Sequence, residues 1–222
     1  MIDFEELRAL AAEAKAADEG PQTLVYLFNP EPQTPPTSTL HRIGGALSAE
    51  RAWPTWKGVP KTHLLTVDLA QTPSLRIGPL ADVRAFSLFV SDPEANRAYE
   101  PHTEETTVWL LRSDEIRNED ALQVPQATPA SSSSFDLVPV EVPARVFEDD
   151  ALDFIDEDDV LVRLWGALAS VPGYIGGGPT WIQHPEHKGT FLGQFSDELI
   201  DMNLGDAGVM YIFADTAFWQ CS

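Results

Sequence analysis

One sequence pattern occurs twice in this chain and restricts how it can fold. The pattern is an Ile-Gly-Gly turn with a tryptophan after it, an apolar strand that ends near a carboxylate, an acidic turn, and a second apolar strand. It spans residues 43–92 and again residues 175–215. Each copy offers the same apolar strand faces, and two such faces can bury each other. We therefore expect two pseudo-equivalent halves, in which residues 64–68 match 191–197 and residues 85–90 match 209–214.

The second copy carries the more specific motifs. They are a Gly-Gly-x-Pro-x-Trp-x-Gln element at residues 176–183, a Phe-Leu-x-Gln strand at 191–194, a Gly-Asp-x-Gly turn at 205–208 and a terminal strand beside Cys221. These motifs resemble those of the bacterial YwqG-like family over about the last third of the chain. That family has no established catalytic residues to carry over. Some members are similar to products encoded beside polymorphic toxins, so the resemblance implies an immunity role.

Length and composition favour a single compact domain. The chain has 222 residues, of which 43% are hydrophobic, and a chain of this size buries enough surface for a substantial core. We predict an α+β fold with mixed or largely antiparallel sheets, formed by tandem duplication of halves at about 22–112 and 135–222. A Ser/Pro-rich linker at about 125–134 joins them. Helices are expected at residues 4–15 and 160–169, and the strand at 137–142 is expected at a sheet edge because it contains proline.

The charge balance restricts the partners. The chain has 35 acidic and 14 basic residues, which gives a formal net charge of −21. Such a surface repels nucleic acid and anionic membranes, and it attracts basic proteins. No apolar run approaches the roughly 20 residues that a membrane helix needs, and the first residues are acidic where a secretory signal is basic. We expect a cytoplasmic protein that binds neither nucleic acid nor membrane.

Acidic charge is concentrated at residues 148–159, which include no Lys or Arg. Four of these acids, residues 156–159, precede the predicted helix at 160–169, where the helix dipole favours each of them by about 0.3–1 kcal/mol. Helix chemistry does not explain the others. A docking patch for a cationic partner would explain these other acids, with Phe154 and Ile155 as apolar anchors. The alternative interpretation is a solvated acidic loop. The candidate partner-binding residues are Glu148, Asp149, Asp150, Asp153, Phe154, Asp156, Glu157, Asp158 and Asp159.

Catalytic and metal-binding patterns are weak. His184 and His187 have nearly helical ligand spacing, but Pro185 lies between them and no cysteine is near. The acidic run lacks the glycine that an EF-hand loop requires, and no Gly-x-Ser-x-Gly element is present. We expect no catalytic residues, no metal and no cofactor.

The sequence therefore predicts a non-enzymatic, cytoplasmic immunity protein that neutralises a cognate bacterial toxin by covering a basic face of that toxin. The alternative is a binding protein or enzyme for a small polar ligand or saccharide, because tryptophan and glutamine together are typical of such pockets. The same residues also suit core packing and turns. The candidate pocket residues are Trp53, Trp56, Trp181, Gln183 and Gln194.

Overall fold

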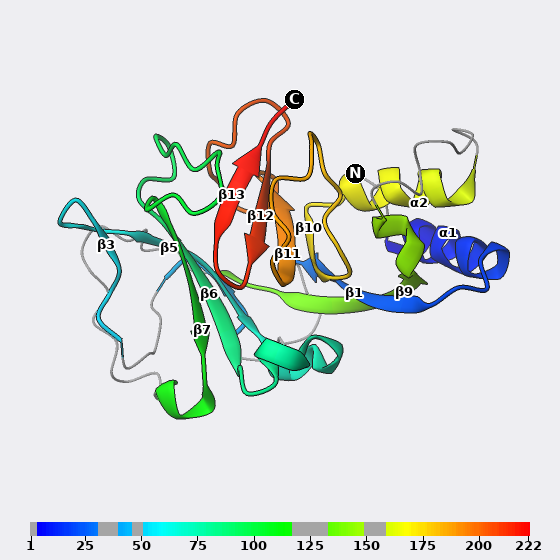
Figure 1. Ribbon diagram of the computed structural model, residues 1–222, viewed down its shortest axis with the longest axis horizontal. Helices are drawn as coiled ribbons and strands as arrows, with labels where there is room; N and C mark the ends of the chain where they lie inside the picture. The colour runs from blue at the N-terminus through cyan, green and yellow to red at the C-terminus, as the bar shows by residue number, and fades with distance from the viewer. Residues whose placement is uncertain (1–3, 31–39, 46–50, 117–132, 149–158) are drawn as a thin grey trace.

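The structure is a computed structural model, and it describes residues 4–30, 40–45, 51–116, 133–148 and 159–222. Within these residues, a six-stranded and a five-stranded sheet pack against each other, and two helices lie at one end of the molecule (Figure 1). Every strand pairing in them is antiparallel. The prediction of an α+β fold with largely antiparallel sheets is therefore confirmed.

The larger sheet has the strand order β13-β12-β11-β10-β1-β9 within the described residues. Its strands are β1 (Gln22–Asn29), β9 (Asp136–Pro143), β10 (Gly173–Gly176), β11 (Phe191–Ser196), β12 (Val209–Phe213) and β13 (Ala217–Gln220). As predicted, the proline-bearing strand β9 lies at the sheet edge, where a missing backbone N–H removes no ladder hydrogen bond.

The smaller sheet has the strand order β7-β6-β5-β2-β8. Its strands are β2 (Arg42–Ile43), β5 (Thr62–Asp68), β6 (Ala85–Val90), β7 (Thr106–Leu111) and β8 (Ser133–Ser134). A separate short hairpin consists of β3 (Thr55–Trp56) and β4 (Val59–Pro60). Strand β8 is the described end of the predicted linker, and the rest of that linker lies outside the described residues.

Both helices cover one face of the larger sheet. Helix α1 (Phe4–Ala17) and helix α2 (Val160–Ala169) have the predicted positions, although α1 continues two residues beyond Lys15. Their apolar sides pack on Val25, Leu27 and Tyr174. No helix among the described residues is long and apolar enough to cross a bilayer.

Short 3-10 helices connect the strands. They are η1 (Leu69–Gln71), η2 (Pro73–Leu75), η3 (Gly78–Leu80), η4 (Ser113–Glu115) and η6 (Ala144–Phe147).

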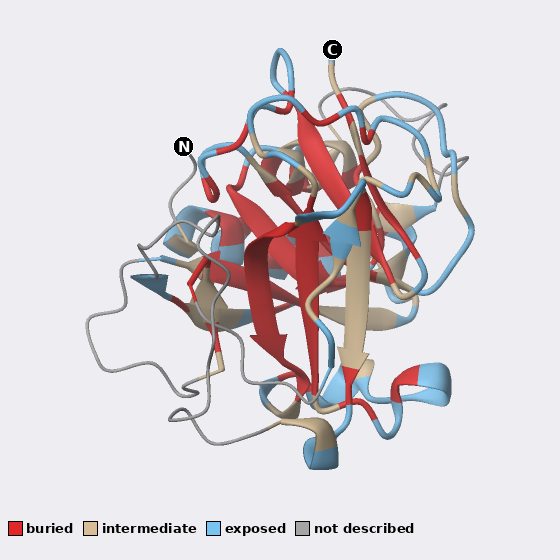
Figure 2. Ribbon diagram, turned by 90° about the vertical axis from the view of Figure 1, so that its left-hand side faces the viewer, coloured by how far each residue is buried: buried red, intermediate tan, exposed pale blue. Residues whose placement is uncertain are grey.

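The main hydrophobic core lies between the two sheets. Phe86 and Leu88 of the smaller sheet belong to the same buried cluster as Phe195 and Ile212 of the larger sheet. Figure 2 shows the strands in the middle of the molecule as almost continuously buried. Because both sheets contribute to one core, neither can bury this face alone.

The two sheets have similar local hydrogen-bonding patterns. Ile43 pairs with Leu65, and Ile175 pairs with Gly193. Each isoleucine precedes two glycines with positive φ, between 65° and 85°, a conformation that favours glycine. Both central strands also carry a register shift, between His63 and Leu65 in β5 and between Phe191 and Gly193 in β11. Shifts of this kind bend a strand and redirect its side chains.

Candidate functional site

The acidic run is described only at its two ends. Glu148 follows η6 and is exposed. Asp159 is the N-cap of α2, and its Oδ1 accepts a hydrogen bond of 2.8 Å from the backbone N–H of Leu161. This is the contact that an aspartate makes at a helix start. The rest of the predicted patch lies outside the described residues: Asp149, Asp150, Asp153, Phe154, Asp156, Glu157 and Asp158.

Gln194 belongs to a buried hydrogen-bond network. Its Oε1 accepts bonds from the Tyr174 hydroxyl at 3.0 Å and from the backbone N–H of Thr180 at 2.9 Å. Its Nε2 donates to the Thr180 hydroxyl at 2.7 Å. Both lone-pair directions of the amide oxygen are therefore used within the protein. This network holds the loop after β10 against the sheet.

Trp181 and Gln183 hold the same loop in place. The Trp181 ring lies 4.7 Å from the Tyr211 ring and stacks on Phe213 and Phe218 at about 6 Å between centroids. Gln183 is exposed, and its Nε2 donates to the backbone carbonyl of Cys221 at 2.6 Å. These contacts cover the outer face of the larger sheet.

Trp53 and Trp56 lie on the smaller sheet's side. Trp53 packs edge-on against Phe89 at 5.3 Å, and its indole N–H donates to the Lys61 carbonyl at 2.7 Å. Trp56 lies in the β3–β4 hairpin, where the Lys57 ammonium sits 3.8 Å above its ring. Trp53 and Trp181 thus belong to two separate packing clusters, one on each sheet, and the five candidate residues do not form one pocket.

A cavity of about 570 Å³ lies elsewhere, beyond the ends of β6 and β7. Arg51 and Arg112 face acidic neighbours there, and Arg51 already donates to Glu115 Oε1 at 2.6 Å and to the Leu110 carbonyl at 2.9 Å. None of the predicted tryptophans or glutamines lines this cavity. Its lining residues are Arg51, Gly78, Pro79, Asp82, Val83, Leu110, Arg112, Asp114 and Glu115.

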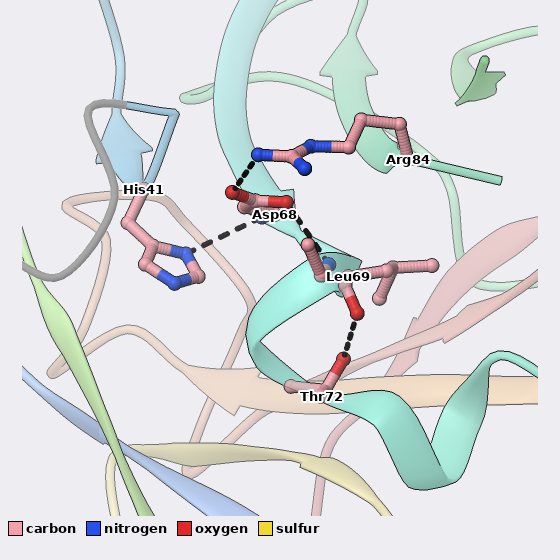
Figure 3. A network of polar contacts seen from close by, with 6 residues as sticks. His41, Asp68, Leu69, Thr72 and Arg84 are labelled. Carbon is pink, nitrogen blue, oxygen red and sulfur yellow. Dashed lines mark hydrogen bonds and ion pairs between the residues drawn. The ribbon is translucent and has the colours of Figure 1, made fainter. Parts of the chain in front are cut away.

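An ion pair between a buried aspartate and a partly exposed arginine at the end of β5 is structural. The side chain of Asp68 is fully buried, and its Oδ2 accepts a bond of 2.8 Å from Arg84 (Figure 3). Its Oδ1 accepts the N–H of Ala70 and so caps η1. His41 Nδ1 accepts the Asp68 N–H at 3.3 Å, and burial lowers the pKa of His41 to about 4 despite the nearby Asp68 and Asp136. His41 is therefore neutral and can accept this bond, and the turn is stabilised by Asp68, which both pairs with Arg84 and caps η1.

Lys61 is a second buried charge. Its ammonium donates to the carbonyls of Glu104 and Thr106 and to the Thr107 hydroxyl. Burial lowers the pKa of Lys61 to about 8, although Glu104 and Glu105 oppose that shift. All three donors are satisfied, by Glu104 in the loop before β7 and by Thr106 and Thr107 at the start of β7, so Lys61 anchors this segment.

Two loops from opposite halves of the chain are fastened together. They are residues 91–105, which connect β6 to β7, and residues 197–208, which connect β11 to β12. The backbone N–H of Asn203 donates to the Pro93 carbonyl at 2.9 Å, and its Nδ2 donates to the Glu94 carbonyl at 3.2 Å. The indole of Trp219, which belongs to β13, also donates to Asn96 of the first loop at 2.8 Å. These bonds give the two loops a common surface.

This common surface is strongly acidic, and we call it the acidic loop surface. Arg97 is the one Lys or Arg in its two loops. Tyr99 packs edge-on against Trp219, yet it remains 49% exposed, one of few large hydrophobic side chains so exposed among the described residues. Sequence reasoning missed this surface because the two segments are about a hundred residues apart. Its exposed acids are Asp92, Glu94, Glu100, Glu104, Asp197, Glu198, Asp201 and Asp206.

Much of the described basic charge is already engaged within the protein. The ion pairs are Arg8–Glu5, Lys15–Glu141, Arg51–Glu115, Arg84–Asp68 and Arg163–Glu13. On the acidic loop surface, Arg97 is the one Lys or Arg beside eight exposed carboxylates.

No protein-family model matches this chain, and no curated protein matches its sequence. The resemblance of residues 175–222 to the YwqG-like family remains a prediction from the motifs.

Proposed function

We propose that this protein is a non-enzymatic, cytoplasmic immunity protein that binds and neutralises a cognate basic toxin. The observation that carries the proposal is the acidic loop surface, whose two loops have eight exposed carboxylates, one arginine and an exposed tyrosine. The family resemblance of the second copy supplies the toxin link. Residues 148–159 remain part of the proposed binding surface.

Charge and the exposed aromatic ring have different roles in this proposal. Clustered carboxylates attract a basic protein and raise its association rate, mainly at low salt. Individual exposed ion pairs contribute only about 0.2–1 kcal/mol each, so they cannot supply high affinity alone. A tyrosine that reaches solvent beside them provides the apolar contact that binding hot spots require. Tyr99 is held by Trp219 and loses little side-chain freedom on binding.

We also propose that the chain arose by tandem duplication. Two four-stranded units have the same antiparallel order, β2-β5-β6-β7 and β10-β11-β12-β13. Both begin with an Ile-Gly-Gly segment at which φ turns positive, and both carry a register shift in their second strand. Such parallels are expected of repeated units that bury one another. They support the proposal, and they explain why both outer faces are covered by a loop that carries a tryptophan.

The small-ligand alternative receives less support. A saccharide pocket needs convergent tryptophan and glutamine side chains with free polar atoms. The side-chain oxygen of Gln194 already accepts hydrogen bonds from Tyr174 and Thr180. Trp53 and Trp181 pack against different sheets. We therefore retain the toxin-binding proposal.

The proposal can be tested with three variants of equal charge change. The first replaces Glu94, Glu100, Asp201 and Asp206 of the acidic loop surface with lysine. The second makes the same change at Glu148, Asp149, Asp150 and Asp153. The third variant is a control and changes Glu6, Glu19, Asp82 and Asp114, which are all exposed. Glu6 lies on α1 and Glu19 follows that helix. Asp82 precedes β6 and Asp114 follows β7, at the strand ends opposite those that residues 91–105 connect. Surface plasmon resonance is measured against the basic protein encoded by the neighbouring gene, at low and high salt.

We expect the first variant to bind about tenfold more weakly or worse, with a slower association rate that depends less on salt. Tyr99→Ala should mainly increase the dissociation rate. The control should retain most of the affinity, since its charge change is the same but its location is different. Equal losses in all three variants would show that net charge alone acts, and no loss in any would contradict the proposed binding surface.

A further inference from the structure

Three potential metal ligands from distant parts of the chain come together beside the β12–β13 hairpin. They are His102, His187 and Asp215, and one ligand atom from each lies within 4.8 Å of the other two. His187 Nε2 is 3.0 Å from Asp215 Oδ1, and the rings of His102 and His187 are 5.1 Å apart. His184, the histidine that sequence spacing pairs with His187, is not part of this group.

His187 is held in place by packing on one side of the group. The His187 ring packs edge-on against Phe213 at 4.6 Å, and its side chain is only 14% exposed. A Cβ on Gly189 would clash with His187 Nε2 and would lie 2.9 Å from Asp215 Oδ1. A side chain at this position would displace the imidazole and the carboxylate from these positions, so glycine leaves the room in which they meet.

His102 is held in an unusual conformation on the other side of the group. Its φ is +60°, which is uncommon for a residue with a side chain. Its backbone N–H donates to the Thr216 hydroxyl at 2.7 Å, directly after Asp215 in the chain. Such conformations cost free energy and persist only where surrounding contacts impose them, and they occur often at ligand sites. The hydrogen bond ties the backbone of His102 to the hairpin that carries the carboxylate.

We propose that His102, His187 and Asp215 form a binding site for a divalent transition-metal ion, with Zn²⁺ as the best match. Two imidazoles and one carboxylate are a known zinc donor set, and three protein ligands leave a fourth position for water. The ligand atoms must close in by about 1 Å to reach tetrahedral zinc geometry, which a rotation of the exposed His102 ring can supply. The acidic surface of the protein favours a cation at this point.

Metal binding would connect the two halves of the molecule. His102 belongs to the loop after β6, whereas His187 and Asp215 belong to the second half. A bound ion would therefore hold residues 91–105 against the β12–β13 hairpin more firmly than the hydrogen bonds of Thr216 and Trp219 do without it. This site is independent of the toxin proposal, because neither its geometry nor its test requires a protein partner.

Isothermal titration of the chelator-treated protein with ZnCl₂ tests the site, and the visible absorption of bound Co²⁺ reports a tetrahedral site with nitrogen and oxygen donors. We expect one ion per wild-type chain. His102→Ala, His187→Ala and Asp215→Asn should each weaken binding by more than about tenfold, since even outer-shell changes cost about 10–100-fold. His184→Ala is the matched control, because this histidine is exposed in the same loop, and it should bind normally.

Two further measurements separate loss of the site from loss of the fold. Gly189→Ala keeps all three ligands and blocks their approach, so we expect an unchanged melting temperature without metal and greatly weakened zinc binding. Zinc should raise the melting temperature of the wild type and of His184→Ala, but not of His187→Ala. The proposal is overturned if wild type binds less than one ion per chain, or if Gly189→Ala and the ligand variants bind zinc as tightly as wild type.

Discussion

At the residue scale, buried polar side chains hold the glycine turns of both sheets. His63 is fully buried, and its Nδ1 lies 3.2 Å and 3.3 Å from the carbonyls of Gly44 and Gly45. A carbonyl can only accept, so Nδ1 carries the proton and Nε2 accepts from the Thr66 hydroxyl at 2.8 Å. Gln194 has a comparable role in the other sheet. Polar side chains that suggest a ligand site in the sequence thus stabilise turns.

The burial of His63 predicts how stability depends on pH. Burial lowers the pKa of His63 to about 4, although bonds to the carbonyls of Gly45, Leu65 and Gly44 oppose the shift. In the unfolded chain the pKa is near 6.5, so the unfolded state binds more protons between about pH 6.5 and 4. The free energy of unfolding should therefore fall as pH drops through this window, by about 3 kcal/mol for this residue. His41 should contribute in the same direction.

Urea unfolding at pH 7, 5.5 and 4.5 measures this effect. His63→Gln keeps a donor and an acceptor but does not titrate, so its stability should decrease less steeply with falling pH than that of the wild type. His184→Gln, an exposed control, should have the wild-type slope. Equal slopes for His63→Gln and wild type would show that His63 does not remain neutral in the folded protein.

At the scale of single elements, the acidic residue before α2 has a measurable structural role. Asp159→Ala removes the hydrogen bond to the Leu161 N–H and should lower the free energy of unfolding by about 1 kcal/mol. Glu148→Ala removes an exposed acid from the other end of the run and should change it by less than about 0.5 kcal/mol. Thermal or urea unfolding of both variants provides the comparison. If the two changes were equal, Asp159 would contribute charge rather than capping.

The elements themselves were largely predictable from local chemistry. Three sequence signals depend only on residues close in the chain: the apolar spacing of residues 4–15, the acids before Val160 and the prolines of β9. The structure has the two helices and the edge strand at the positions that these signals predict. Contacts between distant loops leave no such signal. Nothing in the sequence connects His102 with Asp215, or Pro93 with Asn203, because each pair is about 110 residues apart. The acidic loop surface and the proposed metal ligands could therefore be identified only from the fold.

At the scale of the whole molecule, the shared core predicts that the two sheets unfold together. Phe195 of β11 is 1% exposed and belongs to the cluster that includes Phe86 and Leu88 of β6. Phe195→Ala should lower the free energy of unfolding by about 3–5 kcal/mol, because it removes buried contacts and leaves a cavity. Since both sheets border that cavity, the loss should affect both equally. Val59→Ala, at a position 57% exposed, is the control and should have little effect.

Hydrogen exchange followed by mass spectrometry in increasing urea distinguishes one cooperative unit from two. Peptides from β6 and from β12 report on the smaller and the larger sheet separately. With a common core, both should lose protection at the same urea concentration in the wild type, and at one common lower concentration in Phe195→Ala. If β6 stayed protected where β12 exchanged freely, each half would be stable alone. The core between the sheets would then be an interface between two domains, and the loops that join them at the acidic surface would be free to separate.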